Sequence, residues 1–158
     1  MASNAENAIE KWTAAVGETE GTGEWFEVTQ DRIDQFAEVT EDRQFIHVDP
    51  EMSAQLSPWK VTIAHGFLTL SMLTHLSGSI PQDLDRLTGV VMGVNYGFDK
   101  VRFVNPVKVG SKIRATSVLK AAELKGDSVQ TTRTLTVEIE GEDKPALVAD
   151  WITRFVYS

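Results

Sequence analysis

The segment GFLTLSMLTHLS, residues 66–77, is apolar around nearly its whole circumference when it is written on a helix. Its large apolar side chains are Phe67, Leu68, Leu70, Met72, Leu73 and Leu76. Soluble proteins bury a helix that is apolar on all sides. We therefore predict that residues 66–77 form a central helix inside the core of the protein.

The chain before this segment has a mainly helical pattern. Residues 4–16 and 30–40 each carry apolar side chains at helical spacing, and Thr29 is a good N-cap for the second helix. A short strand is expected at 24–28. Residues 41–49 have no clean period. They are expected to be an irregular connection between helical segments.

The chain after residue 89 has the alternating pattern of β-strands, clearest in the last two strands. Gly126-Asp127 and residues 141–143 are typical of hairpin turns. The predicted strands are 89–103, 111–123, 127–140 and 145–157. An antiparallel sheet wrapped around one central hydrophobic helix is an α+β arrangement, the hot dog fold. We expect one such domain over 1–158, with residues 1–20 as an N-terminal helical extension.

The composition of the chain excludes several classes of function. Its 158 residues hold 15 basic and 23 acidic side chains, and this excess of acid makes nucleic acid or an anionic membrane a poor partner. There is no cysteine, which excludes disulfides and thiolate chemistry. The N-terminus lacks the features of a signal peptide, and no apolar run approaches the roughly 20 residues of a membrane span. We expect a cytoplasmic protein.

The charge is unevenly distributed along the chain. Residues 1–58 carry thirteen acids and three bases, whereas residues 59–158 carry ten acids and twelve bases. Seven of these bases lie within 99–125, against only Asp99 and Glu123. Such a run is usually the solvated face of a strand. It is also a candidate seat for a small polyanionic ligand.

Asp42 and His47 are the side chains best suited to acid–base chemistry. They lie five residues apart in the irregular segment 41–49, where a rigid scaffold can aim side chains into a cleft. A carboxylate and an imidazole that converge on one water molecule form a general acid–base pair. The alternative is structural, with Asp42 capping a turn and His47 packed beneath it. The spacing alone leaves both interpretations open.

The other two histidines are His65 and His75. His75 is expected to be a core or helix-end side chain. The spacings of 18 and 10 residues among the three histidines do not resemble the ligand pairs of a helix or a hairpin. No metal site is therefore predicted.

Three blocks of the sequence resemble the MaoC-like family of (R)-specific enoyl-CoA hydratases. Residues 41–47, EDRQFIH, correspond to the family pattern G-D-x-N-P-[LI]-H. Residues 63–68, IAHGFL, correspond to the later pattern [IV]-x-[HQ]-G-[MF]-L. Residues 95–103, NYGFDKVRF, with Pro106 and the Val-Gly pair that follows, resemble a third block. The resemblance covers about residues 25–157, nearly the whole chain beyond the first helix.

Three positions of the first block depart from the family pattern. Glu41 replaces the glycine, Gln44 the asparagine and Phe45 the proline, a version similar to the branch that contains nodulation protein N. Asp42 and His47 are retained. The resemblance therefore implies the family's chemistry and leaves the substrate range open.

The resemblance implies an enzyme that adds water to trans-2-enoyl-CoA to give (3R)-3-hydroxyacyl-CoA, or that catalyses the reverse dehydration. Asp42 and His47 would be catalytic, and Gly66 would present backbone N–H groups to the thioester oxygen at the start of the central helix. The basic residues within 99–125 add candidates for binding the phosphate groups of CoA. The predicted substrate-binding residues are Gln44, His65, Thr74, Lys100 and Arg102.

No metal and no cofactor beyond the CoA thioester substrate are implied. A homodimer is expected, because a hot dog sheet leaves an edge and an apolar face to be covered. Two other functions stay open, a hot dog acyl-CoA thioesterase and a non-catalytic acyl-thioester-binding module. Residues 66–77 contain no Asp or Glu, which argues against the thioesterase, and retention of Asp42 and His47 argues against the binding module.

Overall fold

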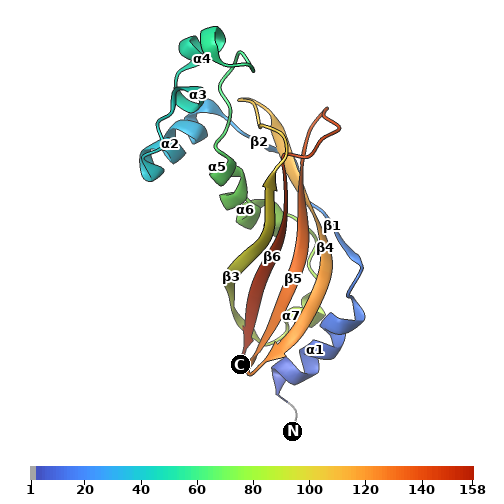
Figure 1. Ribbon diagram of the computed structural model, residues 1–158. Helices are drawn as coiled ribbons and strands as arrows, with labels where there is room; N and C mark the ends of the chain where they lie inside the picture. The colour runs from blue at the N-terminus through green and yellow to red at the C-terminus, as the bar shows by residue number, and fades with distance from the viewer. Residues whose placement is uncertain (1–2) are drawn as a thin grey trace.

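The computed structural model describes residues 3–158 and has one curved antiparallel sheet packed against helices (Figure 1). The strands pair in the order β1-β4-β5-β6-β3, and β2 pairs with β4. The strands are β1 (Thr19–Thr22), β2 (Phe26–Glu27), β3 (Val90–Phe103), β4 (Lys112–Lys125), β5 (Ser128–Ile139) and β6 (Leu147–Tyr157). The four long strands agree with the predicted ones to within two residues at each end.

Several of the helices begin where polar side chains cap the first turn. Ser3 and Glu6 form a capping box at α1, Thr29 accepts from the N–H of Arg32 at α2 as predicted, and Asp49 caps α4. The helices are α1 (Asn4–Ala14), α2 (Gln30–Thr40), α3 (Phe45–Val48), α4 (Pro50–Leu56), α5 (Gly66–Ser71), α6 (Leu73–Gly78) and α7 (Leu84–Leu87). In Figure 1, α2, α3 and α4 gather at one end of the molecule, and α1 lies at the other.

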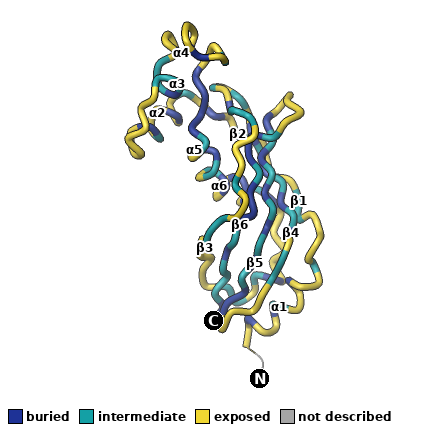
Figure 2. Tube along the Cα trace, viewed as in Figure 1, coloured by how far each residue is buried: buried dark blue, intermediate teal, exposed yellow. Residues whose placement is uncertain are grey.

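The main core lies between the sheet and the helix pair α5–α6. Leu68, Leu73 and Leu76 are 4%, 1% and 1% exposed. They belong to one cluster with alternate residues of the long strands, Ile113, Ala115, Leu135, Val137, Leu147, Ala149 and Trp151. Figure 2 shows buried positions along the middle strands and exposed ones on the outlying helices. The predicted α+β hot dog fold, an antiparallel sheet around a central hydrophobic helix, is confirmed.

The central helix differs from the prediction in its continuity and its burial. It divides at Met72 into α5 and α6, each six residues long. Phe67 is 67% exposed, so the expectation of burial on all sides is wrong for that face of the single chain. Successive residues point about 100° apart on a helix, and the sheet covers only the face that carries the buried leucines. No helix among the described residues is long and apolar enough to cross a membrane.

The sequence patterns predict neither β1 nor α7, and the segment 41–49, expected to be irregular, contains the four-residue helix α3. The strand β1 reads TEGT, has no large apolar side chain to alternate, and pairs with β4 around an irregularity between Thr19 and Gly21. The helix α7 is a single turn of four residues, capped by Asp83. Both elements are set by their surroundings, because their own sequences contain no periodic signal.

The described part of the predicted N-terminal extension, residues 3–20, packs on the sheet. Ala5, Ala8 and Trp12 of α1 are buried in a second cluster with side chains of β4, β5 and β6. Nε1 of Trp12 donates to the hydroxyl of Tyr157 at 2.9 Å, which ties α1 to the last strand. Residues 1–2 of the predicted extension lie outside the described residues.

The strand β3 forms one edge of the sheet and, among the described strands, pairs only with β6. It carries large apolar side chains that are exposed in the single chain, Val91, Met92, Val94, Tyr96 and Phe103. A long apolar edge strand is normally paired or covered in native proteins. This edge is therefore the part of the sheet most suited to pairing with another strand or to being covered by another chain.

Candidate active site

Asp42 follows the end of α2, where the chain turns through a left-handed residue. Glu41, the C-cap of α2, has φ 62° and ψ 11°, a conformation that glycine adopts without steric cost. The backbone therefore explains why the family pattern has glycine at this position. Arg43 forms ion pairs with Glu41 and with Glu38 beside the turn. The side chain of Asp42 remains 48% exposed.

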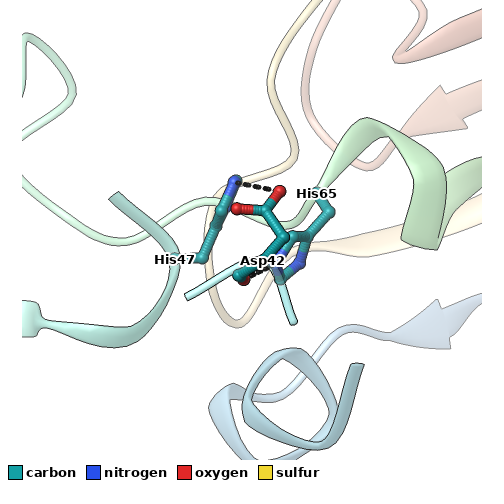
Figure 3. A group of neighbouring side chains, drawn as sticks. All are labelled: Asp42, His47 and His65. Carbon is teal, nitrogen blue, oxygen red and sulfur yellow. Dashed lines mark hydrogen bonds and ion pairs between the residues drawn. The ribbon is translucent and has the colours of Figure 1, made fainter. Parts of the chain in front are cut away.

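His47 lies in α3 and faces Asp42, and we refer to these two residues as the reactive pair (Figure 3). A carbonyl oxygen only accepts hydrogen bonds, so the 2.7 Å contact from Nδ1 of His47 to the carbonyl of Ile63 places the proton on Nδ1. The lone pair of Nε2 lies 4.0 Å from Oδ2 of Asp42. This distance is too long for a direct hydrogen bond and is one at which water commonly bridges two groups.

The protonation of His47 follows from its burial. Burial lowers the pKa of the imidazole below its ordinary value of 6.5, and the hydrogen bond to Ile63 and the charge of Asp42 oppose this shift. Positive charge on His65 would lower the pKa further. His47 is therefore neutral at pH 7, the form in which Nε2 accepts a proton.

His65 completes the cluster from a third segment of the chain. Its ring stacks on that of His47, with the ring centroids 3.7 Å apart and the planes 23° apart. Its Nε2 lies 2.9 Å from the backbone carbonyl oxygen of Asp42. On α2, Phe36 lies 5.0 Å away between ring centroids. His65 is only 2% exposed, so the structure encloses it beside the reactive pair.

Asp42, His47 and His65 also place their ligand atoms within 4.8 Å of one another, as a metal site would require. The stacking of the two imidazoles argues against this use. Two imidazoles on one ion direct their lone pairs to a common point, whereas nearly parallel stacked rings direct them side by side. The cluster is therefore better suited to proton transfer.

A cavity of about 220 Å³ lies against the first turn of α5. Its wall includes Ile63 and Gly66, the residues on either side of the Ala-His step that leads into the helix. Thr69 and Phe103 also line it, and a Cβ added to Gly66 would lie 3.0 Å from the Phe103 ring. The first N–H groups of a helix have no intrahelical partner. Gly66 therefore brings backbone donors next to a largely apolar cavity.

Gln44 and Thr74, two of the predicted substrate-binding residues, lie in different places. Gln44 is exposed, and its backbone N–H donates to Oδ1 of Asp42 at 3.4 Å. Thr74 is exposed on α6. The buried hydroxyl in the cavity belongs to Thr69, which the sequence analysis did not identify. Its spacing of three from Gly66 is the available signal, because residues i and i+3 share one face of a helix.

Lys100 and Arg102, the predicted phosphate ligands, lie in an irregular part of β3. The pairing of β3 with β6 shifts between residues 99 and 102, and Lys100 has a φ of 54°. Nζ of Lys100 is 4.0 Å from the carboxylate of Asp150, and Nη1 of Arg102 donates to the carbonyl of Val101 at 2.7 Å. Both side chains are exposed. Among residues 3–158, neither forms a hydrogen bond or an ion pair with the reactive pair.

The sequence model of the family described as "MaoC like domain" matches residues 11–140, which is most of the chain. The chain belongs to the MaoC-like family. Nodulation protein N of Rhizobium leguminosarum bv. viciae is 49% identical over 139 residues, which cover 87% of this chain and 84% of that protein. The 3-hydroxyacyl-thioester dehydratase Z of Mycobacterium tuberculosis (strain H37Rv) is 47% identical over 144 residues, 90% of this chain and 92% of that protein.

A solved structure agrees with this assignment. The (R)-hydratase from A. caviae, described as involved in PHA biosynthesis, has a TM-score of 0.68 to this MaoC-like chain. The two are 25% identical, over 87% of this chain and 94% of that one. The family resemblance read from the three sequence blocks is confirmed, and so is the likeness to nodulation protein N. Proteins named as hydratases and dehydratases are among its relatives, and this family membership supports a hydro-lyase.

Proposed function

We propose that this MaoC-like protein is an (R)-specific enoyl-CoA hydratase. It adds water to a trans-2-enoyl thioester to give the (3R)-3-hydroxyacyl thioester, or catalyses the reverse dehydration. The observation that carries the proposal is the 4.0 Å separation between Nε2 of His47 and Oδ2 of Asp42, with the tautomer of His47 fixed by Ile63. The similarity to 3-hydroxyacyl-thioester dehydratase Z and to the A. caviae (R)-hydratase supports it.

In this mechanism the reactive pair holds one water molecule between two acceptors. Neutral His47 takes a proton through Nε2 as the water oxygen attacks C3, and the carboxylate of Asp42 orients the water and stabilises the imidazolium. The pair then delivers one proton to C2 from the same side of the substrate. OH and H therefore add syn, and both residues return to their starting protonation.

The thioester oxygen gains negative charge as water attacks, and it needs hydrogen-bond donors at that moment. We assign this role to the backbone N–H groups at Gly66, where α5 begins and no side chain blocks the approach. The adjoining cavity of about 220 Å³, lined by Thr69 and Phe103, is the proposed seat of the acyl chain.

Lys100 and Arg102 are the proposed ligands of the CoA phosphates, because both are exposed cations. Arg102→Ala should raise the KM for an enoyl-CoA severalfold with little change in kcat, since contacts remote from the reacting carbons act on binding. Steady-state kinetics with crotonyl-CoA measures both constants. An unchanged KM would remove Arg102 from the site.

The exposed edge of β3 supports the proposed homodimer. A second copy of the chain offers the same edge, and two antiparallel copies would satisfy each other's free backbone N–H and C=O groups. The exposed apolar side chains of β3 would be covered by the same contact. Light scattering should give the mass of two chains, and a monomer at micromolar concentration would contradict the proposal.

Crotonyl-CoA tests the activity directly, because hydration removes the absorbance of the conjugated enoyl thioester. Coupling to an (R)- or (S)-specific 3-hydroxyacyl-CoA dehydrogenase reports the configuration of the product. Asp42→Asn and His47→Gln should each lower kcat by about 10²–10⁴-fold and leave the thermal midpoint near the wild-type value. His75→Gln is the matched control, because His75 is an exposed histidine whose ring packs on Phe26.

Each alternative has its own outcome in these assays. No loss of absorbance with short, medium or branched enoyl-CoA substrates would refute the hydratase. Release of free thiol from an acyl-CoA would identify a thioesterase, and binding without turnover would identify a non-catalytic module. Unfolding of both reactive-pair variants would show that Asp42 and His47 are structural.

A further inference from the structure

His65 contacts both members of the reactive pair from inside the protein. Its Nε2 is 2.9 Å from the backbone carbonyl oxygen of Asp42, and its ring face lies on the ring of His47 at 3.7 Å between centroids. The residue is 2% exposed. A side chain enclosed to this extent meets protein atoms, so the predicted contact of His65 with substrate has little surface available to it.

The hydrogen bonds of His65 define its proton. The carbonyl of Asp42 accepts only, so Nε2 carries a hydrogen and donates it. Nδ1 of His65 is buried and has no hydrogen-bond partner among the described residues. A second proton on Nδ1 would leave a charged donor unpaired in the interior, which is strongly unfavourable. The contacts of His65 are therefore those of a ring whose single hydrogen is on Nε2.

We propose that His65 is a positioning residue that holds Asp42 and His47 in register with each other. The ring edge fixes the backbone of Asp42, and the ring face fixes the plane of the His47 imidazole. One rigid ring thus connects two groups that come from different parts of the chain. The inference rests on the proposed hydratase function of the pair, in which misplacement by about 1 Å costs on the order of 100-fold in rate.

Three substitutions separate the two contacts of His65. His65→Gln keeps an N–H donor and removes the ring face, whereas His65→Phe keeps a ring face and removes the donor. His65→Leu removes both. With crotonyl-CoA, kcat should fall about 10-fold in each of the first two variants and about 100-fold in the third, with KM within about threefold of wild type. His75→Gln, an exposed histidine on α6, should keep wild-type kcat.

Two kinetic results would overturn the proposal. A folded His65→Leu variant with wild-type kcat would show that the ring does not position the pair. A raised KM with unchanged kcat would make His65 a substrate-binding residue instead.

A measurement on the wild-type protein tests the same contacts without turnover. Nitrogen-15 NMR of the imidazoles should show the hydrogen of His65 on Nε2 and that of His47 on Nδ1 at pH 7. A ring of His65 with no hydrogen on Nε2 could not donate to the carbonyl of Asp42 and would overturn the proposal, even where a variant fails to fold. Absence of hydratase activity in the wild-type protein would instead refute the proposed function, and the NMR result would still report the geometry.

Discussion

Replacing Gly66 with alanine tests whether this position is small because of its packing or because of the substrate. The new Cβ would lie 3.0 Å from Cδ1 of Phe103, about 0.5 Å inside a normal carbon–carbon contact. Phe103 is 51% exposed, so its ring can turn aside, at a cost on the order of 0.5–1.5 kcal/mol. Replacing glycine with alanine recovers roughly 0.4–1 kcal/mol, because it restricts the unfolded chain. The two effects nearly cancel, and the free energy of unfolding should change by less than about 1 kcal/mol.

The effect of the same methyl group on activity should be much larger. It would stand at the start of α5, where the backbone N–H groups are proposed to receive the thioester oxygen. Loss of one such donor, or displacement of the substrate by about 1 Å, costs on the order of 100-fold. We therefore expect kcat/KM of Gly66→Ala to fall about 100-fold while the protein stays folded.

Urea unfolding and crotonyl-CoA hydration measure the two effects separately. Gly78→Ala is the matched control, because a Cβ there meets nothing within 4 Å. It should stabilise the protein by about 0.4–1 kcal/mol without changing the activity. Combining Gly66→Ala with Phe103→Ala removes the close contact and should not restore activity. The reasoning is refuted if Gly66→Ala keeps wild-type kcat/KM or if the double variant recovers it.

Three further predictions concern protonation and stability. Since the pKa of His47 is lowered, kcat/KM should stay constant as the pH falls through 6.5 and should decline only at lower pH. The free energy of unfolding should decrease at pH values below 6.5, because the unfolded chain binds the proton first. Glu41→Gly should stabilise the protein by about 0.5–1 kcal/mol, because glycine removes the left-handed strain at φ 62°. Asp150→Ala should destabilise it by about 1–2 kcal/mol, because Lys120 and Thr134 each lose a charged hydrogen bond, at 2.6 and 2.7 Å.

Each of these predictions has a contrary outcome. An acidic limb of the pH–rate profile above 6.5 would show that burial does not govern His47. A lower urea midpoint for Glu41→Gly would mean that its ion pair with Arg43 outweighs the strain. An unchanged urea midpoint for Asp150→Ala would show that its partners are equally well solvated without it.

The reactive pair could be predicted from the sequence, whereas its support could not. Asp42 and His47 lie in one short segment, and their types and order indicate acid–base chemistry by themselves. The stacking with His65 depends on how the start of α5 meets α3, which is set by contacts such as the 2.9 Å bond from the N–H of Ile63 to the carbonyl of Ile46. No pattern within a single segment encodes a contact of that kind.

Some elements of the fold could likewise be predicted from the sequence, and others could not. The long strands could be predicted because alternation of apolar and polar side chains is a local signal of a half-buried sheet. The strand β1 could not, since its sequence TEGT has no alternating apolar side chains; it is held to β4 by backbone pairing and by polar contacts such as the hydrogen bond from Ser117 to Glu20 at 2.7 Å. The exposure of Phe67 was not predicted, because the apolar circumference of a helix does not say how many of its sides one chain can cover.

The position of β6 in the sheet has a consequence for the order in which the protein folds. The last strand of the chain lies between β5 and β3, and Tyr157 at its end is 4% exposed. During synthesis, β3 therefore has no strand partner until β6 has left the ribosome, and its apolar side chains are exposed to solvent until then. Pairing across some 50 residues is slow to form. The sheet is thus expected to be completed only after β6 has been synthesised, and β3 is exposed to chaperones during that interval.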